Sequence, residues 1–163
     1  METQLTHEEF NLHNPAYCGF LLYSLLREHW EIDQNGLNSA LVYLCLPIVL
    51  TKSISTRLPS TSKSSMIAWF VENDGCFYDF SKRASSYFEI TQLAIDFLVE
   101  RQLITVSDDG YLLFVKSKLP KSPLLFTKSL SMKKQLGAAK LMGKWLALSP
   151  NASTIYSVLG IKP

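Results

Sequence analysis

The chain has 163 residues, of which 47% are hydrophobic and 18% are charged. This composition excludes an intrinsically disordered chain and allows one hydrophobic core of ordinary size. The formal net charge of +2 hides an asymmetry, because residues 1–109 hold all 14 acids and residues 110–163 hold nine lysines and no acid. Either the two parts neutralise each other in the fold, or the C-terminal third presents a basic face to an anionic partner.

Several features of the sequence predict a soluble cytoplasmic protein. The cysteines lie far apart in apolar surroundings without metal or redox spacing, which is typical of buried thiols in a reducing compartment; they are Cys18, Cys45 and Cys76. The N-terminus carries acids where an export signal carries positive charge. The apolar runs at residues 15–26 and 40–50 are too short to span a bilayer, so we expect no membrane segment.

The first half of the chain predicts two apolar helices. Asn14 and Pro15 form a strong helix start, and this helix runs to about Trp30 with apolar residues on nearly every side. Such a helix is either central or covered on its second side by a partner. A turn at residues 33–36 precedes a second helix over about residues 37–46, which Pro47 ends or kinks. Residues 51–63 form a long Ser/Thr-rich connection, which we interpret as a surface loop in preference to a phosphate-contacting one.

Residues 64–115 have the outline of a winged-helix-like core. Helices are predicted at residues 64–73, 78–85 and 88–102, followed by two short strands at residues 103–106 and 111–114. Asp108, Asp109 and Gly110 form the turn of this hairpin. The apolar stripe of the third helix is predicted to comprise Ile90, Leu93, Ala94, Phe97 and Leu98.

The charges of this unit argue against direct DNA recognition. The third helix would be the reading helix, and against a single Arg101 its outer face carries Glu89, Gln92, Asp96 and Glu100. The hairpin tip is also acidic, whereas affinity for duplex DNA depends largely on cationic contacts with phosphates. We therefore favour a protein-docking or structural role over a sequence-specific DNA reader.

The C-terminal third is predicted to form a basic strap and two helices. Residues 116–128 are rich in lysine and proline, and a long helix follows at residues 130–148. A last short helix at residues 153–159 ends at Gly160. The long helix carries uncompensated lysines that are candidates for contact with DNA or an acidic partner, although an ordinary solvated face has equal weight; they are Lys133, Lys134, Lys140 and Lys144.

No pattern typical of an active site occurs in the sequence. It has no phosphate-binding loop, no nucleotide-binding glycine turn and no nucleophile elbow. The histidines have no partners at metal-binding spacing; they are His7, His13 and His29. We expect a single domain without catalytic activity, cofactor or metal, mainly α-helical with a small β-hairpin. Its parts are residues 14–63, the winged-helix-like unit 64–115 and residues 116–163.

Short motifs in a fixed order resemble a known family. They are Asn14-Pro15-Ala16, Leu46-Pro47-Ile48-Val49-Leu50, Leu58-Pro59-Ser60, Arg83-Ala84, Gly143-Lys144-Trp145, Thr154-Ile155-Tyr156 and Leu159-Gly160-Ile161-Lys162-Pro163. In this order the chain resembles the middle component of bacterial three-component ABC systems. That family includes the small accessory subunit (LmuC type) of Lamassu anti-phage and anti-plasmid defence complexes.

The resemblance implies a bridging subunit with no chemistry of its own. Such a subunit would dock on the ATPase heads of an SMC/Rad50-like protein and link them to an effector, often a nuclease, with DNA reached mainly through the assembled complex. The residues that the resemblance marks as a partner interface are Gly143, Lys144, Trp145, Tyr156, Leu159, Ile161 and Lys162. Trp145 and Tyr156 have a second interpretation as core anchors.

Two other functions remain as alternatives from the sequence. A stand-alone winged-helix transcriptional regulator would require a basic reading helix, which the acids of the third predicted helix oppose. An antitoxin-like inhibitor that masks an enzyme would have one tight partner and no ATPase.

Overall fold

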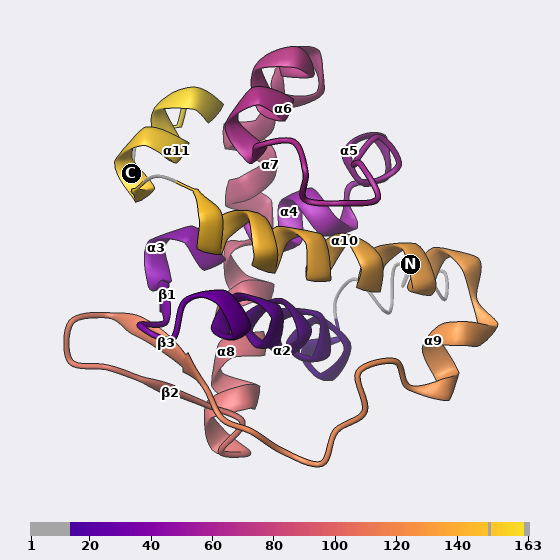
Figure 1. The fold of residues 1–163 in the computed structure, drawn as a ribbon, viewed down its shortest axis with the longest axis vertical. Helices are drawn as coiled ribbons and strands as arrows, with labels where there is room; N and C mark the ends of the chain where they lie inside the picture. The colour runs from indigo at the N-terminus through magenta and orange to yellow at the C-terminus, as the bar shows by residue number, and fades with distance from the viewer. Residues whose placement is uncertain (1–13, 150, 162–163) are drawn as a thin grey trace, which may run out of the picture.

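A computed structural model describes residues 14–149 and 151–161 of the chain (Figure 1). Its first described helix, α2 (Pro15–Ile32), begins as the sequence predicts. Asn14 accepts hydrogen bonds from the backbone N–H groups of Ala16 and Tyr17 at 2.9 and 3.4 Å, and Pro15 needs no partner at the first helical position. Between residues 17 and 27 only Phe20 is not fully buried. The helix is therefore central within its own chain.

The predicted second helix at residues 37–46 is wrong. This segment forms a two-residue strand, β1 (Leu37–Asn38), and two short helices, α3 (Ser39–Val42) and α4 (Cys45–Leu50). Pro47 neither ends nor follows a helix but lies in the first turn of α4. A proline is tolerated there because the first N–H groups of a helix have no intrahelical acceptor.

The helices predicted between residues 64 and 102 are confirmed to within a few residues. The connection after α4 contains a short helix, α5 (Lys52–Ser55), and then come α6 (Met66–Glu72), the 3₁₀ helix η1 (Asp74–Phe77), α7 (Phe80–Ser86) and α8 (Phe88–Glu100). The stripe predicted on α8 needs one correction, because Leu93 is 46% exposed whereas Ile95 is buried. Helical spacing alone did not reveal that the side of α8 with Ile95 is covered by the rest of the chain.

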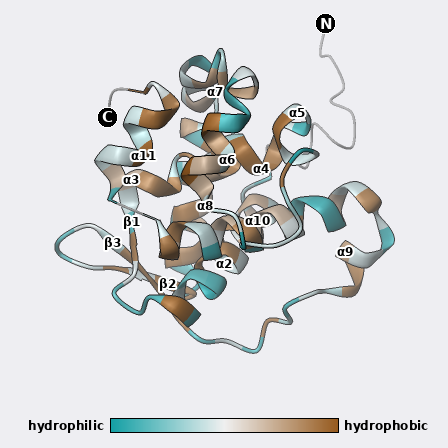
Figure 2. Ribbon diagram, turned by 45° about the horizontal axis from the view of Figure 1, so that its top comes forward, coloured by the Kyte–Doolittle hydropathy of each residue, from teal (hydrophilic) through white to brown (hydrophobic). Residues whose placement is uncertain are grey.

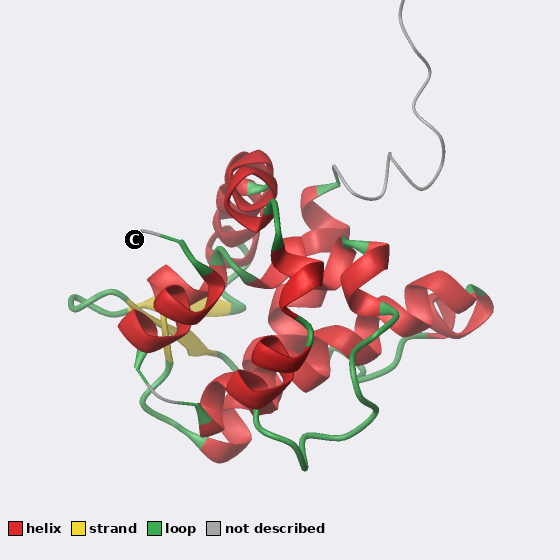
Figure 3. Cartoon of the chain, turned by 90° about the horizontal axis from the view of Figure 1, so that it is seen from above, coloured by secondary structure: helices red, strands yellow, loops and turns green. Residues whose placement is uncertain are grey.

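The predicted hairpin is confirmed, and a third strand joins it. Strands β2 (Ile104–Val106) and β3 (Tyr111–Phe114) pair antiparallel, and β1 pairs with the other edge of β3, so that Leu37 lies opposite Leu112. Residues 64–115 therefore do not form an independent unit. Residues 37–38 supply a strand to their sheet, and α8 packs on α2. The winged-helix interpretation stays a prediction, whereas the mainly helical class with a small sheet is confirmed (Figure 3).

The last part of the chain wraps around α2. The strap predicted at residues 116–128 is irregular as far as Pro123 and then forms a short helix, α9 (Leu124–Lys128). The Tyr23 hydroxyl donates to the Val115 carbonyl and the Arg27 guanidinium to the Leu119 carbonyl, each at 2.9 Å. These two bonds hold the beginning of the strap against α2.

Two helices complete the chain as predicted, namely α10 (Leu130–Leu148) and α11 (Ala152–Leu159). Gly160 ends α11 with a left-handed φ of 69°. Hydrophobic segments gather where α2, α4, α8 and α10 meet, and α9 lies at the periphery (Figure 2). Within the described residues, none of the helices has the length and apolar character needed to cross a membrane.

Candidate functional site

Helix α10 carries most of the residues that the sequence analysis singles out. The Ser129 hydroxyl caps it by accepting a hydrogen bond from the Met132 N–H at 3.3 Å. Its inner side is buried against α2 and α4 through Leu136, Ala138, Ala139, Leu141, Met142, Gly143, Trp145 and Leu146. The helix therefore has one side in the core and another on the surface, and the two sides have different roles.

Gly143 and Trp145 lie on the inner side. A Cβ atom at position 143 would lie 2.2 Å from the carbonyl oxygen of Leu25, so only glycine permits α2 and α10 to approach this closely. Trp145 is 1% exposed, and its indole N–H donates to the Ser64 carbonyl at 2.8 Å. It also contacts the Trp69 ring at a centroid distance of 5.8 Å. Both residues thus have internal contacts that account for their identity.

The predicted interface residues near the C-terminus are also mostly internal. Tyr156 is buried and donates its hydroxyl to the Ala40 carbonyl, and Leu159 is buried beside it on α11. Ile161 is half-buried against the core, and Lys162 lies outside the described residues. The core-anchor interpretation of Trp145 and Tyr156 matches these contacts, and a partner interface at the marked residues stays a prediction.

The predicted lysine face is present on α10, but its members differ. Lys133, Lys140 and Lys144 share one side because their spacing follows the helical repeat. The Nζ atom of Lys144 lies 4.0 Å from a Glu28 carboxylate oxygen. Lys140 donates to the Ser122 hydroxyl at 3.1 Å, and burial lowers its pKa although Glu28 opposes this shift. The expectation of an uncompensated face is therefore wrong for Lys144.

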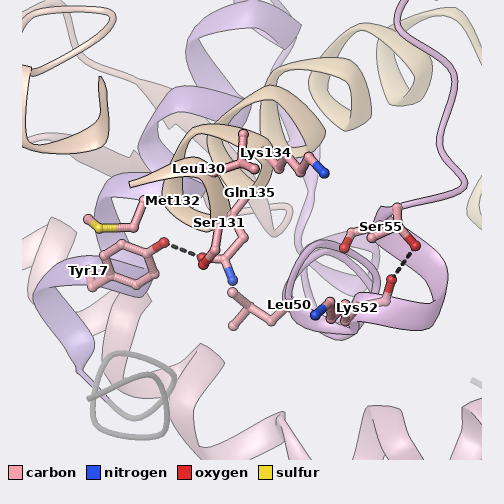
Figure 4. Close-up of a pocket in the computed structure, with 10 residues that line it drawn as sticks. Tyr17, Leu50, Lys52, Ser55, Leu130, Ser131, Met132, Lys134 and Gln135 are labelled. Atoms are coloured by element: carbon pink, nitrogen blue, oxygen red, sulfur yellow. Dashed lines mark hydrogen bonds between the residues drawn. The ribbon is translucent and has the colours of Figure 1, made fainter. Parts of the chain in front are cut away.

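Lys133 and Lys134 are exposed, and neither forms an ion pair with any residue that the structure describes. Lys134 lines a groove of about 380 Å³ between the first turns of α10, the beginning of α2 and α5 (Figure 4). The groove is lined by Tyr17, Leu50, Lys52, Ser55, Thr56, Leu130, Ser131, Met132, Lys134 and Gln135. Sequence reasoning missed this site because its walls come from three distant segments. The Ser/Thr-rich connection with its Lys52 was the one available signal.

Hydrogen bonds order two sides of the groove. The Tyr17 hydroxyl donates to the Gln135 side-chain oxygen, and the Thr56 hydroxyl donates to the Lys52 carbonyl at 2.7 Å (Figure 4). Burial is the main cause that raises the pKa of Tyr17, with the neighbouring Cys18 as a smaller one. Tyr17 therefore stays neutral and remains a donor at physiological pH.

The cysteines and the buried histidine of the described segments do not form a metal site. Among the residues described, no three His, Cys, Asp or Glu side chains lie where they would hold a metal ion. Burial raises the pKa of the Cys18 thiol to about 12 and also raises that of Cys45, so both stay protonated. His29 is buried, and desolvation lowers its pKa despite the opposing charge of Asp33.

The outer side of α8 is acidic, as the sequence predicts. Glu89, Asp96 and Glu100 are exposed there, and Gln92 bridges to Asp96 at 3.1 Å while it accepts a bond from the Tyr43 hydroxyl at 2.7 Å. Arg101 lies over Phe97, with its guanidinium carbon 3.5 Å from the ring centre. The carboxylates of this surface would repel the phosphates of a DNA backbone.

Comparison with protein families identifies a family to which the chain is similar. The model of the family described as "ABC-three component (ABC-3C) system Middle Component 3" matches residues 2–163. No curated protein and no solved structure matches the chain.

Proposed function

The chain belongs to the Middle Component 3 family of ABC-three component systems, and from this premise we propose that it is a non-catalytic bridging subunit. In this proposal it docks on the ATPase heads of an SMC/Rad50-like protein and links them to an effector nuclease in defence against phages or plasmids, as in Lamassu. A middle component of a multi-component system works beside an ATPase and an effector, so its surface has to bind protein.

An exposed apolar segment at the edge of the fold is the observation that carries this proposal. Leu124 and Leu125 of α9 and Leu130 of α10 are 72%, 65% and 70% exposed. Single exposed leucines are ordinary, but three within seven residues at the periphery are typical of an interaction site (Figure 2). Phe126 anchors α9 by stacking on Tyr17 at a centroid distance of 5.5 Å, so the leucines are held outward.

The charges around this segment support a protein partner more than DNA alone. Lys128 lies between Leu125 and Leu130, Lys133 follows them, and neither lysine has an ion pair with described residues. DNA would use the lysines but leave the leucines in water, whereas a protein surface with apolar and acidic residues would cover both. The acidic outer side of α8 also opposes the alternative of a DNA-binding transcriptional regulator.

A pull-down from the native host tests the proposal. The tagged protein is expected to recover a long coiled-coil ATPase and a second enzyme, identified by mass spectrometry, while the isolated protein binds duplex DNA negligibly. Changing Leu124, Leu125 and Leu130 to serine should remove the ATPase or the effector from the eluate. The matched control is Val71→Ser on α6, which is similarly exposed at 63% but lies outside the segment.

Two results would contradict the bridging role. Tight binding of duplex DNA by the isolated protein, with no ATPase recovered, would favour the regulator. Recovery of one enzyme without any ATPase would favour an inhibitor that masks its partner.

A further inference from the structure

We infer that the groove between α5 and the amino end of α10 binds an acidic peptide segment of a partner subunit. The peptide inserts an apolar side chain into the groove, and its carboxylates pair with Lys52 and Lys134. This inference deepens the proposed function and rests on it, since the partner is taken to be a protein of the same complex. It concerns a different surface from the exposed apolar segment formed by Leu124, Leu125 and Leu130, although Leu130 belongs to both.

The inner wall of the groove is suited to an apolar side chain. Leu50 and Tyr17 are buried there, and the half-buried Met132 completes the wall from α10. Methionine adapts its shape to different partners, which suits a peptide anchor. With a volume of about 380 Å³, the groove lies within the range of pockets that hold ligands in proteins.

The charge of the groove selects an anion. Lys52 comes from α5 and Lys134 from α10, so the two ammonium groups belong to different walls (Figure 4). Both lysines are exposed, neither has an ion pair within the described part of the chain, and none of the ten lining residues is acidic. Carboxylates of a bound peptide would pair with these cations without displacing an existing ion-pair partner.

Hydrogen-bond donors lie beside these lysines. Ser55 and Ser131 bring hydroxyl groups to the lining, whereas the Thr56 hydroxyl already donates to the Lys52 carbonyl. The backbone N–H groups at the first positions of α10 have no acceptor within the helix, and Ser129 caps only that of Met132. These groups add to the preference for negative charge but do not define the site by themselves.

The combination of an apolar wall with two free cations favours a peptide over other anions. A duplex offers phosphates but no apolar group for the inner wall, and inorganic phosphate would leave that wall empty. Peptide segments that insert one large side chain and place acids on basic residues match both features.

Selection from a random-peptide display library with the purified full-length protein tests the inference. The expected peptides carry Asp or Glu next to Leu, Ile, Phe or Trp. The double variant Lys52→Glu, Lys134→Glu should weaken binding of a selected synthetic peptide by about tenfold or more, and binding should weaken as salt increases. The control Lys63→Glu, Lys82→Glu makes the same charge change at two exposed lysines that do not line the groove, and it should bind like the wild type.

A second variant separates loss of the groove from loss of the fold. Ser55→Phe places a ring in the groove without changing charge and should also abolish peptide binding. Circular dichroism of each variant confirms that the protein remains folded, so that a loss of affinity reports on the groove.

Several outcomes would overturn the inference. Selection of basic or uncharged peptides, or equal binding by the Lys52/Lys134 variant and the control, would show that the groove does not recognise acids. Binding of inorganic phosphate or of phosphatidylserine vesicles in competition with the peptide would assign it to another ligand. Competition by a peptide with the sequence of residues 1–13, which contains Glu8, Glu9 and Phe10, would assign it to this chain itself.

The two proposals fail separately. If the wild-type protein recovers the ATPase but the library yields no acidic peptide, the bridging role stands and the groove inference falls. If no ATPase is recovered, the bridging role falls whatever the library selects.

Discussion

At the scale of single residues, two glycines of the same helix have opposite roles. A Cβ atom on Gly143 would lie 2.2 Å from the Leu25 carbonyl oxygen, whereas one on Gly137 would meet nothing within 4 Å. Gly143→Ala is expected to lower the free energy of unfolding by about 1–3 kcal/mol or more, because α2 and α10 have to separate. Gly137→Ala should raise it by about 1 kcal/mol, because alanine favours helix more than glycine does.

Urea denaturation of both variants measures this difference. The two variants are controls for each other, since each adds one methyl group to α10 and the expected changes in stability have opposite signs. Equal effects at the two positions would mean that α2 and α10 do not meet at Gly143.

His29 gives the protein a predicted dependence on pH. Desolvation lowers the pKa of this buried side chain below its ordinary value of 6.5, although Asp33 partly opposes the shift. In the unfolded chain the imidazole takes up a proton at a higher pH than in the fold. The neutral imidazole therefore costs the fold nothing above pH 6.5. As the pH falls from 6.5 toward the lower folded pKa, the free energy of unfolding decreases by at most about 1.4 kcal/mol per pH unit.

Urea midpoints at pH of about 7.5 and 5.5 test this expectation. The wild type should lose more stability between the two conditions than His29→Gln, in which no group titrates at this position. The carboxylates titrate in both proteins and cancel in the comparison. An unchanged pH dependence in His29→Gln would show that the imidazole is not responsible.

At the scale of elements, the sequence predicted best what local chemistry determines. The helix start at Asn14 and Pro15, the stop at Gly160 and the hairpin turn at Gly110 were predicted because each has its own short-range signal. Strand β1 was missed because a segment of two residues is too short to show alternation of apolar and polar side chains. Its strand conformation depends on pairing with β3. The groove was missed for a similar reason, since tertiary contacts alone bring α5 to the amino end of α10.

Arg27 holds the strap to α2 together with Tyr23 and Glu31. Its guanidinium lies 4.9 Å from the Tyr23 ring centre and donates to the Leu119 carbonyl, while most of the side chain is buried. Arg27→Gln should lower the free energy of unfolding by about 1–3 kcal/mol. It should also accelerate tryptic cleavage at Lys116, Lys118 and Lys121, because the strap is released.

Limited proteolysis followed by mass spectrometry measures the cleavage rates. Arg101→Gln is the control, because Arg101 lies over the Phe97 ring of α8 and donates to the Phe97 carbonyl. If both variants are cleaved at the wild-type rate, the strap is held by other contacts, such as those of Tyr23.

At the scale of the whole molecule, the charge asymmetry of the sequence is only partly neutralised. In the described part of the chain, both ion pairs join α2 to the C-terminal third: Glu31 pairs with Lys121 at 3.5 Å and Glu28 with Lys144 at 4.0 Å. The Glu31–Lys121 pair is exposed on both sides and so adds little to stability, whereas Glu28 is partly buried. The exposed Lys133 and Lys134 at the beginning of α10 have no such ion pair among the described residues.

This division predicts which lysine acts if the assembled complex uses this subunit to hold DNA. Lys133 is exposed and without an ion pair among described residues, whereas Glu28 holds Lys144. Lys133→Gln should lower the slope of log affinity against log salt by about 0.9, the value for one phosphate contact. Lys144→Gln should change it less. Retention of a duplex by the purified complex over a salt series measures both slopes, and if neither changes, DNA contact has to be assigned to another subunit.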